Sequence, residues 1–145
     1  MEFYIEQVKV FSPELVEALN TLLKQLASDV ASLTKEDIEN MISSKSNRLF
    51  VARKSDDKKI VGMLTLIIYR IPVWKKAWLE DIVVDKEYRS KGIATKLIEH
   101  AIGAAKADKV LSLNFTSNPE RIEANKLYER LGFKKRNTNV YNINI

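Results

Sequence analysis

The sequence contains no cysteine, and its single histidine is His100. Disulfide bonds and thiolate metal sites are therefore excluded, and nothing in the cysteine content indicates secretion. No set of side chains has the spacing of metal ligands, so no metal site is expected. His100 stands between Glu99 and Ala101 in a helical pattern, and we interpret it as a surface or packing residue rather than as a base.

Long hydrophobic runs are also missing. The longest one, near residues 63–69, is far too short to cross a bilayer, and residues 1–6 lack the basic start and apolar run of a signal peptide. A cytoplasmic protein without membrane association is therefore expected. The 145 residues, 46% of them hydrophobic and 30% charged, show no repeat or interdomain linker and favour one globular domain spanning 1–145.

The stretch from residue 78 to residue 105 carries the strongest local pattern. Residues 78–84 have the β-branched and aromatic content of a strand, with Glu80 and Asp81 side by side. Because neighbouring strand residues point to opposite faces, these two carboxylates can share a cavity only if a β-bulge re-aims one of them. A helix follows, and its apolar residues form one stripe: Ile93, Leu97, Ile98, Ala101, Ile102 and Ala105.

The loop between this strand and this helix has the composition of a phosphate-binding turn. Arg89 and Lys91 supply positive charge, while Gly92 and Ala94 keep side-chain bulk small where a ligand approaches the backbone. The first turn of a helix leaves N–H groups unpaired and carries partial positive charge, so it can hold a pyrophosphate. The loop matches neither the Walker pattern nor Gly-x-Gly-x-x-Gly.

Apolar periodicity and turn residues predict the remaining elements. Further strands are expected at residues 3–10, 48–54, 60–70, 110–115, 133–135 and 140–145. Further helices are expected to begin with Ser12 as N-cap, with Thr34 and Asp37 as a capping box, and with Asn118 as N-cap, the last helix ending at Gly132. This order implies a mixed α/β sheet with helices on both faces.

Two motifs resemble those of one enzyme superfamily. Arg89-x-x-Gly92-x-Ala94 matches the Arg/Gln-x-x-Gly-x-Gly/Ala signature of the GNAT superfamily of N-acetyltransferases, and residues 124–133 are similar to its Ala-x-x-Leu-Tyr-x-x-x-Gly-Phe ending. The resemblance runs from about residue 48 to the C-terminus, while the first two helices match in type and position. It implies an α/β (α+β) fold with a mixed, mostly antiparallel central sheet of about six to seven strands flanked by about four helices.

The resemblance also implies an activity and a set of site residues. GNAT proteins transfer an acetyl group from acetyl-CoA to a primary amine by direct attack. The implied base is Glu80, with Asp81 as its rival, and the implied acid is Tyr128. The implied cofactor contacts are the pantetheine-pairing backbone of Ile82, Val83 and Val84 and the pyrophosphate-binding loop of Arg89, Ser90, Lys91, Gly92, Ile93, Ala94 and Thr95.

One position departs from the family pattern. Arg121 stands where many members carry an asparagine that contacts the cofactor. Asn118 and Asn125 are candidates to replace that contact, although Asn118 as a helix cap and Asn125 as a solvent-facing residue are the simpler interpretations. Each other role has a structural alternative too. Glu80 fits a salt-bridged carboxylate equally well, Tyr128 fits a core aromatic residue, and the basic loop residues fit solvated charges.

The chemistry of acetyl transfer requires these residue types. An alkylamine with a pKa near 10.4 must lose a proton before it attacks, and a carboxylate can accept that proton, directly or through water. A phenol with a pKa near 10 can protonate the leaving thiolate. Bringing the amine and the thioester together supplies a further rate gain that does not depend on proton transfer.

The partners are less defined than the reaction. The formal charge of +5 suits coenzyme A and would also suit nucleic acid, but the basic residues are scattered, so nucleic acid is not the expected partner. Glu80, Asp81, Glu36 and Asp37 favour a small cationic amine as acceptor. A protein N-terminus or lysine is the alternative acceptor, and a non-catalytic acyl-CoA-binding module is the alternative function.

Two segments have open interpretations. Residues 27–33 fit the lining of an acceptor pocket or a plain interhelical loop. Trp74 fits the cover of a substrate mouth, a dimer contact or a partly buried core residue. A homodimer is expected from the resemblance and from the apolar residues 69–78.

Overall fold

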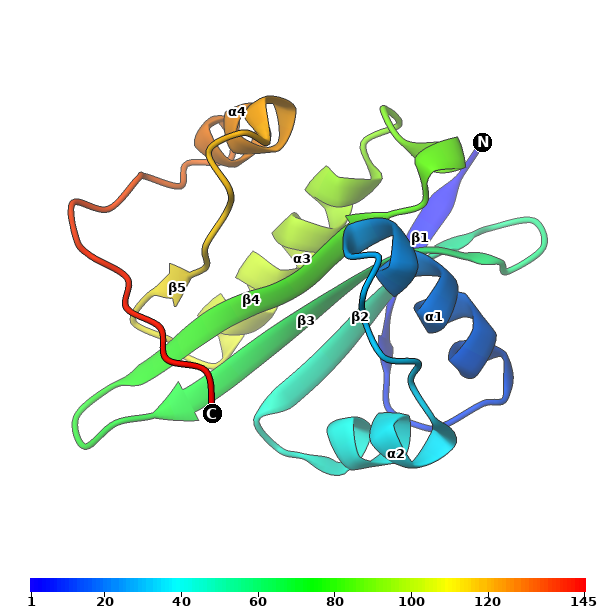
Figure 1. Cartoon of the computed structure of the whole chain (residues 1–145), viewed down its shortest axis with the longest axis horizontal. Helices are drawn as coiled ribbons and strands as arrows, with labels where there is room; N and C mark the ends of the chain where they lie inside the picture. Colours follow the sequence, from blue (N-terminus) through cyan, green and yellow to red (C-terminus); the bar gives the residue numbers. More distant parts are fainter. The chain divides into compact units, whose positions relative to one another are not determined.

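The computed structural model describes residues 1–145 (Figure 1). It divides into two compact units, Met1–Phe115 and Thr116–Ile145, which are described one at a time. The first unit contains β1 (Phe3–Val8), α1 (Glu14–Leu26), α2 (Lys35–Ser43), β2 (Asn47–Lys54), β3 (Ile60–Arg70), β4 (Lys75–Val84), the 3₁₀ turn η1 (Lys86–Tyr88), α3 (Ile93–Ala107) and β5 (Leu113–Asn114). The second unit contains α4 (Ile122–Arg130).

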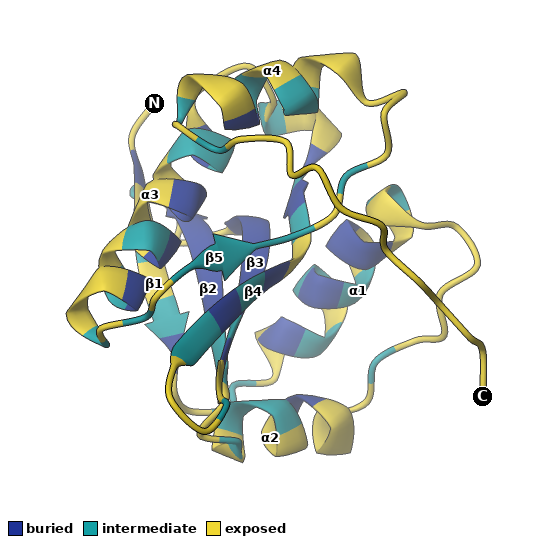
Figure 2. Ribbon diagram, turned by 90° about the vertical axis from the view of Figure 1, so that its left-hand side faces the viewer, coloured by how far each residue is buried: buried dark blue, intermediate teal, exposed yellow.

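The sheet of the first unit is mixed and mostly antiparallel, as predicted. Its strand order is β1-β2-β3-β4-β5, with antiparallel pairing from β1 to β4 and parallel pairing of β5 with β4. The helices of this unit lie on both faces, α1 on one side of the sheet and α3 on the other (Figure 2). None of the four helices has the length and apolar character of a bilayer-spanning segment.

The number of strands is lower than predicted, because the sheet has five. Residues 133–135 and 140–145 form no strand, and residues 110–115 contribute only the two residues of β5. In the second unit, Tyr141 and Ile143 are 87% and 81% exposed. Alternating apolar and polar residues indicate which face of a strand would be buried, but a strand forms only when a neighbouring strand pairs with it. These residues have no such neighbour.

One face of the sheet is covered by α1 and α2. The leucines of α1 recur at helical spacing and are buried: Leu15, Leu19, Leu22 and Leu23. The predicted capping box begins α2, because Thr34 Oγ1 accepts from Asp37 N at 3.2 Å and Asp37 Oδ2 accepts from Thr34 N at 2.8 Å. The predicted cap of α1 is wrong: Pro13 holds the N-cap position with no side-chain cap, and the Ser12 hydroxyl contacts Glu14 instead.

The other face of the sheet is covered by α3, which approaches closely at Gly62. A Cβ atom on Gly62 would lie 3.2 Å from Leu97 Cδ1 and 3.3 Å from both Ile93 Cγ2 and the Val83 carbonyl oxygen. A Cβ atom here would require these neighbours to shift by a few tenths of an ångström, so glycine favours this close contact. The contact brings the first turn of α3 beside the last residues of β4, where the predicted phosphate-binding loop connects them.

Candidate functional site

A β-bulge interrupts β4 at Asp81. Met63 is paired with Val83, whereas Thr65 is paired with Glu80, so Asp81 and Ile82 together oppose a single residue of β3. Asp81 has a φ of 54°, in the left-handed region. The bulge that would be needed to re-aim one of the two adjacent carboxylates is therefore present.

Glu80 is exposed and held by a tryptophan two residues before it. Trp78 Nε1 donates to Glu80 Oε1 at 2.9 Å, as expected for residues i and i+2 on one face of a strand. Glu80 takes part in no ion pair, so the structural alternative of a salt-bridged carboxylate is not realised in this structure. The sequence-based interpretation missed the contribution of Trp78, although its spacing from Glu80 on a predicted strand was the available signal.

Asp81 differs from Glu80 in its surroundings. Asp81 is exposed, as Glu80 is, but desolvation of its carboxyl raises the pKa of that group, because the charged form loses hydration. The left-handed backbone of Asp81 is one that aspartate tolerates better than most residues do. Asp81 is thus the residue that makes the bulge, next to a Glu80 that is anchored by hydrogen bonding.

The second half of β4 has one open edge, which we define as the side of residues 79–84 that faces away from β3. Strand β5 is paired only with Ala77 and Trp78. Asp85 N donates to Val61 O at 2.8 Å, so the N–H and C=O groups of Val84 face away from β3. The Val84 carbonyl accepts from Arg89 Nε at 3.0 Å. An extended ligand with amide groups can pair with such an edge as an added strand does.

The loop after β4 is exposed and presents unpaired N–H groups. Ser90 and Gly92 have φ values of 61° and 81°, and Gly92 is the N-cap of α3 without a side-chain cap. The first intrahelical bond at this end runs from Lys96 N to Gly92 O at 3.1 Å. The N–H groups of residues 93–95 therefore lack intrahelical acceptors, and no acidic residue occupies the first turn. This arrangement fits an anionic phosphate group.

Charge and flanking contacts support the same interpretation. Arg89 and Lys91 are exposed beside the loop, and the bond to Val84 uses only Nε of Arg89. The turn before the loop is fixed, because Asp85 Oδ1 accepts from Glu87 N at 3.0 Å and Gln25 Oε1 accepts from Lys86 N at 2.8 Å. Residues 89–92 thus form a continuous exposed turn, and residues 93–95 form the first turn of α3, where Ile93 is buried. The left-handed Ser90 carried no sequence signal.

In the second unit, Tyr128 lies on α4 and contacts Phe133. Their rings meet edge to face with centroids 6.5 Å apart. Gly132 has a φ of 96° and follows the C-cap of α4, as its predicted role requires. Burial raises the pKa of the Tyr128 phenol, and the positive charge of Arg121, together with a hydrogen bond from its side chain, partly offsets that effect. The residue that departs from the family pattern therefore acts on the predicted acid.

The predicted helix cap at Asn118 is wrong, because α4 begins at Ile122 with Arg121 as its N-cap. Asn118 instead closes a turn before the helix, where its Oδ1 accepts from Glu120 N at 2.9 Å. Such local side-chain bonds compete with helix formation. Asn125 Nδ2 donates to Asn118 O at 3.0 Å. Both asparagines therefore brace this turn, and their cofactor contacts stay predictions.

The loop between α1 and α2 is held by Asn20. Asn20 Nδ2 donates to Leu33 O at 3.0 Å, and Asn20 Oδ1 accepts from Leu33 N at 2.7 Å. The side chain of Asp37 is used by the capping box, which lowers the pKa of that carboxyl.

Trp74 is 49% exposed at the β3–β4 turn, so it is less buried than a core residue.

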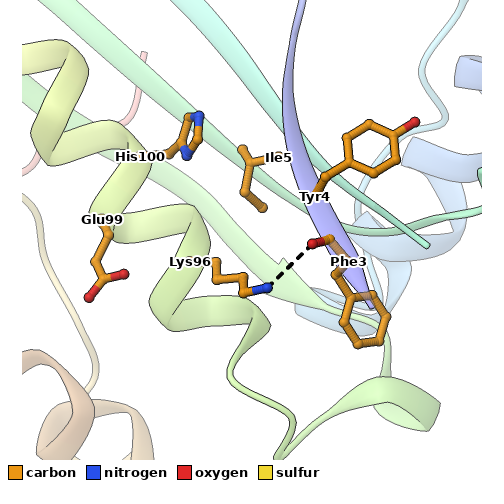
Figure 3. Close-up of a pocket in the computed structure, with 6 residues that line it drawn as sticks. All are labelled: Phe3, Tyr4, Ile5, Lys96, Glu99 and His100. Atoms are coloured by element: carbon orange, nitrogen blue, oxygen red, sulfur yellow. Dashed lines mark hydrogen bonds between the residues drawn. The ribbon is translucent and has the colours of Figure 1, made fainter. Parts of the chain in front are cut away.

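A hollow of about 410 Å³ lies between α3 and the outer strand β1 (Figure 3). It is lined by Phe3, Tyr4, Ile5, Lys96, Glu99 and His100. Lys96 Nζ donates to Phe3 O at 3.3 Å across it, and His100 also meets the Phe50 ring edge-on at 6.0 Å. His100 is thus a surface residue in an aromatic contact. None of the predicted catalytic or cofactor-binding residues lines this hollow.

Comparison with known proteins identifies a family model and a human relative. The model described as "Acetyltransferase (GNAT) family" matches residues 15–133. N-acetyltransferase 8 of Homo sapiens is 27% identical over 137 residues, which cover 87% of this chain and 58% of that protein. The chain therefore spans less than two thirds of the length of this relative.

Solved structures share the fold. A putative acetyltransferase from Agrobacterium tumefaciens str. C58 superposes with a TM-score of 0.84 and 19% identity, covering 97% of this chain and 99% of that one. The aminoglycoside N-acetyltransferase AAC(6')-Iy in complex with CoA has a TM-score of 0.81 and 19% identity, covering 99% of this chain and 95% of that one. At such identities the likeness concerns the fold alone.

Proposed function

This chain belongs to the Acetyltransferase (GNAT) family, and on that premise we propose that it transfers an acetyl group from acetyl-CoA to a primary amine by direct attack. The observation that supports this proposal is the order of three features along the chain. The carboxylates Glu80 and Asp81 lie at the bulge of β4, the open edge of β4 follows them, and the uncapped N-terminus of α3 comes next. GNAT acetyltransferases use acetyl-CoA, and a structural neighbour holds CoA.

The residues of the first unit fit acetyl-CoA, which supplies an activated acetyl thioester when bound. The backbone of Ile82, Val83 and Val84 would hold its amide-containing arm along the open edge. The N–H groups of residues 93–95, with Arg89 and Lys91, would hold its diphosphate. The absence of an acidic residue from the first turn of α3 supports this assignment.

Glu80 is the proposed base and Tyr128 the proposed acid. Glu80 is exposed and oriented by the Trp78 indole, so its free carboxylate oxygen is available to accept a proton from the acceptor ammonium. Tyr128 suits the donation of a proton to the leaving thiolate, because its raised pKa keeps the phenol protonated at neutral pH. Asp81 is the rival base, and its role in the bulge favours Glu80.

We expect the acceptor to be a small cationic amine. Two carboxylates on β4, Glu80 and Asp81, give the acceptor side a negative charge that attracts an ammonium group. A protein N-terminus or lysine is the alternative acceptor, and a non-catalytic acyl-CoA-binding module is the alternative function. The family match over residues 15–133 runs through both compact units and supports one acetyltransferase domain over 1–145. A homodimer and a cytoplasmic location stay predictions.

The first experiment is a thermal unfolding series with acetyl-CoA, followed by an amine panel that reads the release of free thiol. Acetyl-CoA at about a hundredfold over its Kd should stabilise the chain by about 2.7 kcal/mol. The double variant R89A/K91A should lose most of that gain, whereas K45A, an exposed lysine after α2, should keep it. No stabilisation of the wild-type chain would refute the proposal, and binding without thiol release from any amine would favour the module.

A further inference from the structure

The hydroxyl of Thr65 is a buried polar group without a partner in the chain. Thr65 lies in the middle of β3 with 5% of its surface exposed, and no donor or acceptor is bonded to its Oγ1. Most buried polar atoms in folded proteins have a hydrogen-bond partner, and leaving one unpaired destabilises the fold. We therefore expect the Thr65 hydroxyl to form a hydrogen bond with a ligand or with another side chain in a second state of the protein.

Strand register places Thr65 directly opposite Glu80. Thr65 is paired with Glu80 of β4 on one side and with Leu49 of β2 on the other. Directly opposed residues put their side chains on one face, with Cβ atoms ~5 Å apart. Leu49, like Met63 two residues before Thr65, belongs to the core beneath α1 and α2. Thr65 and Glu80 therefore share the face that these helices cover.

Few other polar groups compete for this hydroxyl. The side chains that α1 and α2 bury against this face are apolar: Leu15, Leu19, Leu22, Leu23 and Ile38. Ile67 follows Thr65 on the same face of β3 and is apolar as well, and it is paired with Trp78. Glu80 is thus the ionisable side chain directly opposed to Thr65, and Asp81 is the next one along the strand.

The Glu80 carboxylate has one oxygen to spare. Its Oε1 accepts from the Trp78 indole at 2.9 Å, and no bond within the chain is recorded for its Oε2. We infer that Thr65 is a positioning residue for the proposed acetyl transfer: its hydroxyl donates to the second oxygen of Glu80 when that side chain turns onto the sheet beneath a bound amine. This inference rests on the proposed function.

Two donors, the indole N–H and the hydroxyl, would fix the direction of the carboxylate. A lone pair of Glu80 then accepts the proton of the acceptor ammonium as that N–H bond breaks. The freed nitrogen lone pair forms the N–C bond to the acetyl carbonyl, the C–S bond breaks, and Tyr128 protonates the thiolate. Without the Thr65 hydroxyl, the carboxylate keeps one anchor and samples unproductive orientations.

The test compares Thr65→Val, which keeps the shape and removes the hydroxyl, with Thr65→Ser, which keeps the hydroxyl. Because the hydroxyl is unpaired in this structure, T65V should unfold at the same temperature as the wild-type chain or higher. Its kcat at pH 7 should nevertheless fall about tenfold, with the KM for acetyl-CoA unchanged. T65S should recover most of the lost rate.

Two further readouts separate positioning from a general structural effect. The defect of T65V should shrink as the pH rises past about 10.4, because an alkylamine acceptor is then mostly neutral and needs no base. In an E80Q background, T65V should have no additional effect, because both changes act through one carboxylate. Wild-type turnover by T65V, or a loss that is the same at every pH, would overturn the inference while the proposed function stands. A wild-type chain that acetylates no amine would overturn both.

Discussion

The first half of β4 is paired on both edges, whereas the second half is paired on one. Ala77 and Trp78 lie between β3 and β5, and Lys75 at the start of the strand binds Asp108 after α3 at 3.2 Å. Beyond Trp78 only β3 continues, and the bulge at Asp81 shifts the register. A strand anchored at one end can leave N–H and C=O groups free at the other without losing its place in the sheet.

The difference separates stability from function along a single strand. In the paired half, neighbouring strands bind the backbone groups, and Lys75 forms an ion pair with Asp108, which follows α3 and also binds Arg48 of β2. In the half with the open edge, the residues with proposed roles follow one another from Glu80 to the loop before α3. Substitutions in the two halves should therefore act on different measurements.

The largest effect is expected at Glu80, where the open edge begins. Replacing Glu80 with Gln keeps the Trp78 hydrogen bond but removes the proton acceptor, so kcat should fall about 10³-fold. The stabilisation by acetyl-CoA should be unchanged, because Glu80 is assigned to the acceptor side. Thiol release and thermal unfolding measure the two effects. An E80Q variant with wild-type kcat would assign the base to another group.

The next effect distinguishes two glycines of the α3 segment that both have space for a Cβ atom. Gly92 has a φ of 81°, so Gly92→Ala should destabilise the chain by about 1 kcal/mol and weaken acetyl-CoA binding about tenfold. Gly103 lies inside the helix, so Gly103→Ala should stabilise it by up to about 1 kcal/mol with binding unchanged. Urea unfolding and calorimetric titration provide the measurements. Equal effects at both positions would remove the special role of the loop.

A smaller effect is expected at the bulge. Desolvation raises the pKa of Asp81, so its charged form destabilises the fold above the unfolded-state pKa near 3.9 and not below it. Asp81→Asn should therefore unfold at higher urea than the wild-type chain at pH 7, and this gain should vanish below about pH 4. Asp81→Val should be less stable at both pH values, because a β-branched residue disfavours a φ of 54°. Loss of turnover in D81N would make Asp81 the base instead of Glu80.

The smallest effect is expected in the paired half. Asp108→Asn weakens the contacts with Arg48 at 3.3 Å and Lys75 at 3.2 Å. These side chains are partly exposed, so the loss should stay below about 1 kcal/mol and diminish in high salt. Acetyl transfer should not change. A large loss of activity in D108N would contradict the division between the two halves of β4.

Part of this organisation was predictable from the sequence because it depends on close neighbours along the chain. The leucine stripe of α1, the capping box of Thr34 and Asp37, and the glycine before α3 each involve residues within one or two helical turns. The family resemblance, carried by the motif around Gly92 and by residues 124–133, is confirmed by the family match. The roles of Glu80, Tyr128 and the cofactor-binding residues stay predictions.

Other features were predicted wrongly or not at all. Asn118 was expected to cap α4 but closes the turn before it, because an asparagine side chain bonds nearby backbone as readily as a helix end. Residues 140–145 alternate as a strand does but are unpaired. The hydrogen bond between Arg121 and Tyr128 has no pattern that marks it in advance.

By itself, the sequence determined which residue types stand at each turn, cap and helix face, since these choices are made by steric and hydrogen-bonding rules that act over a few residues. Only the tertiary structure decided that β5 leaves β4 after Trp78, that Asp81 forms the bulge, and that Thr65 is buried opposite Glu80. The physical reason is that strand partners come from distant positions. Alternation along one strand specifies its faces, but not the neighbour that will pair with each edge.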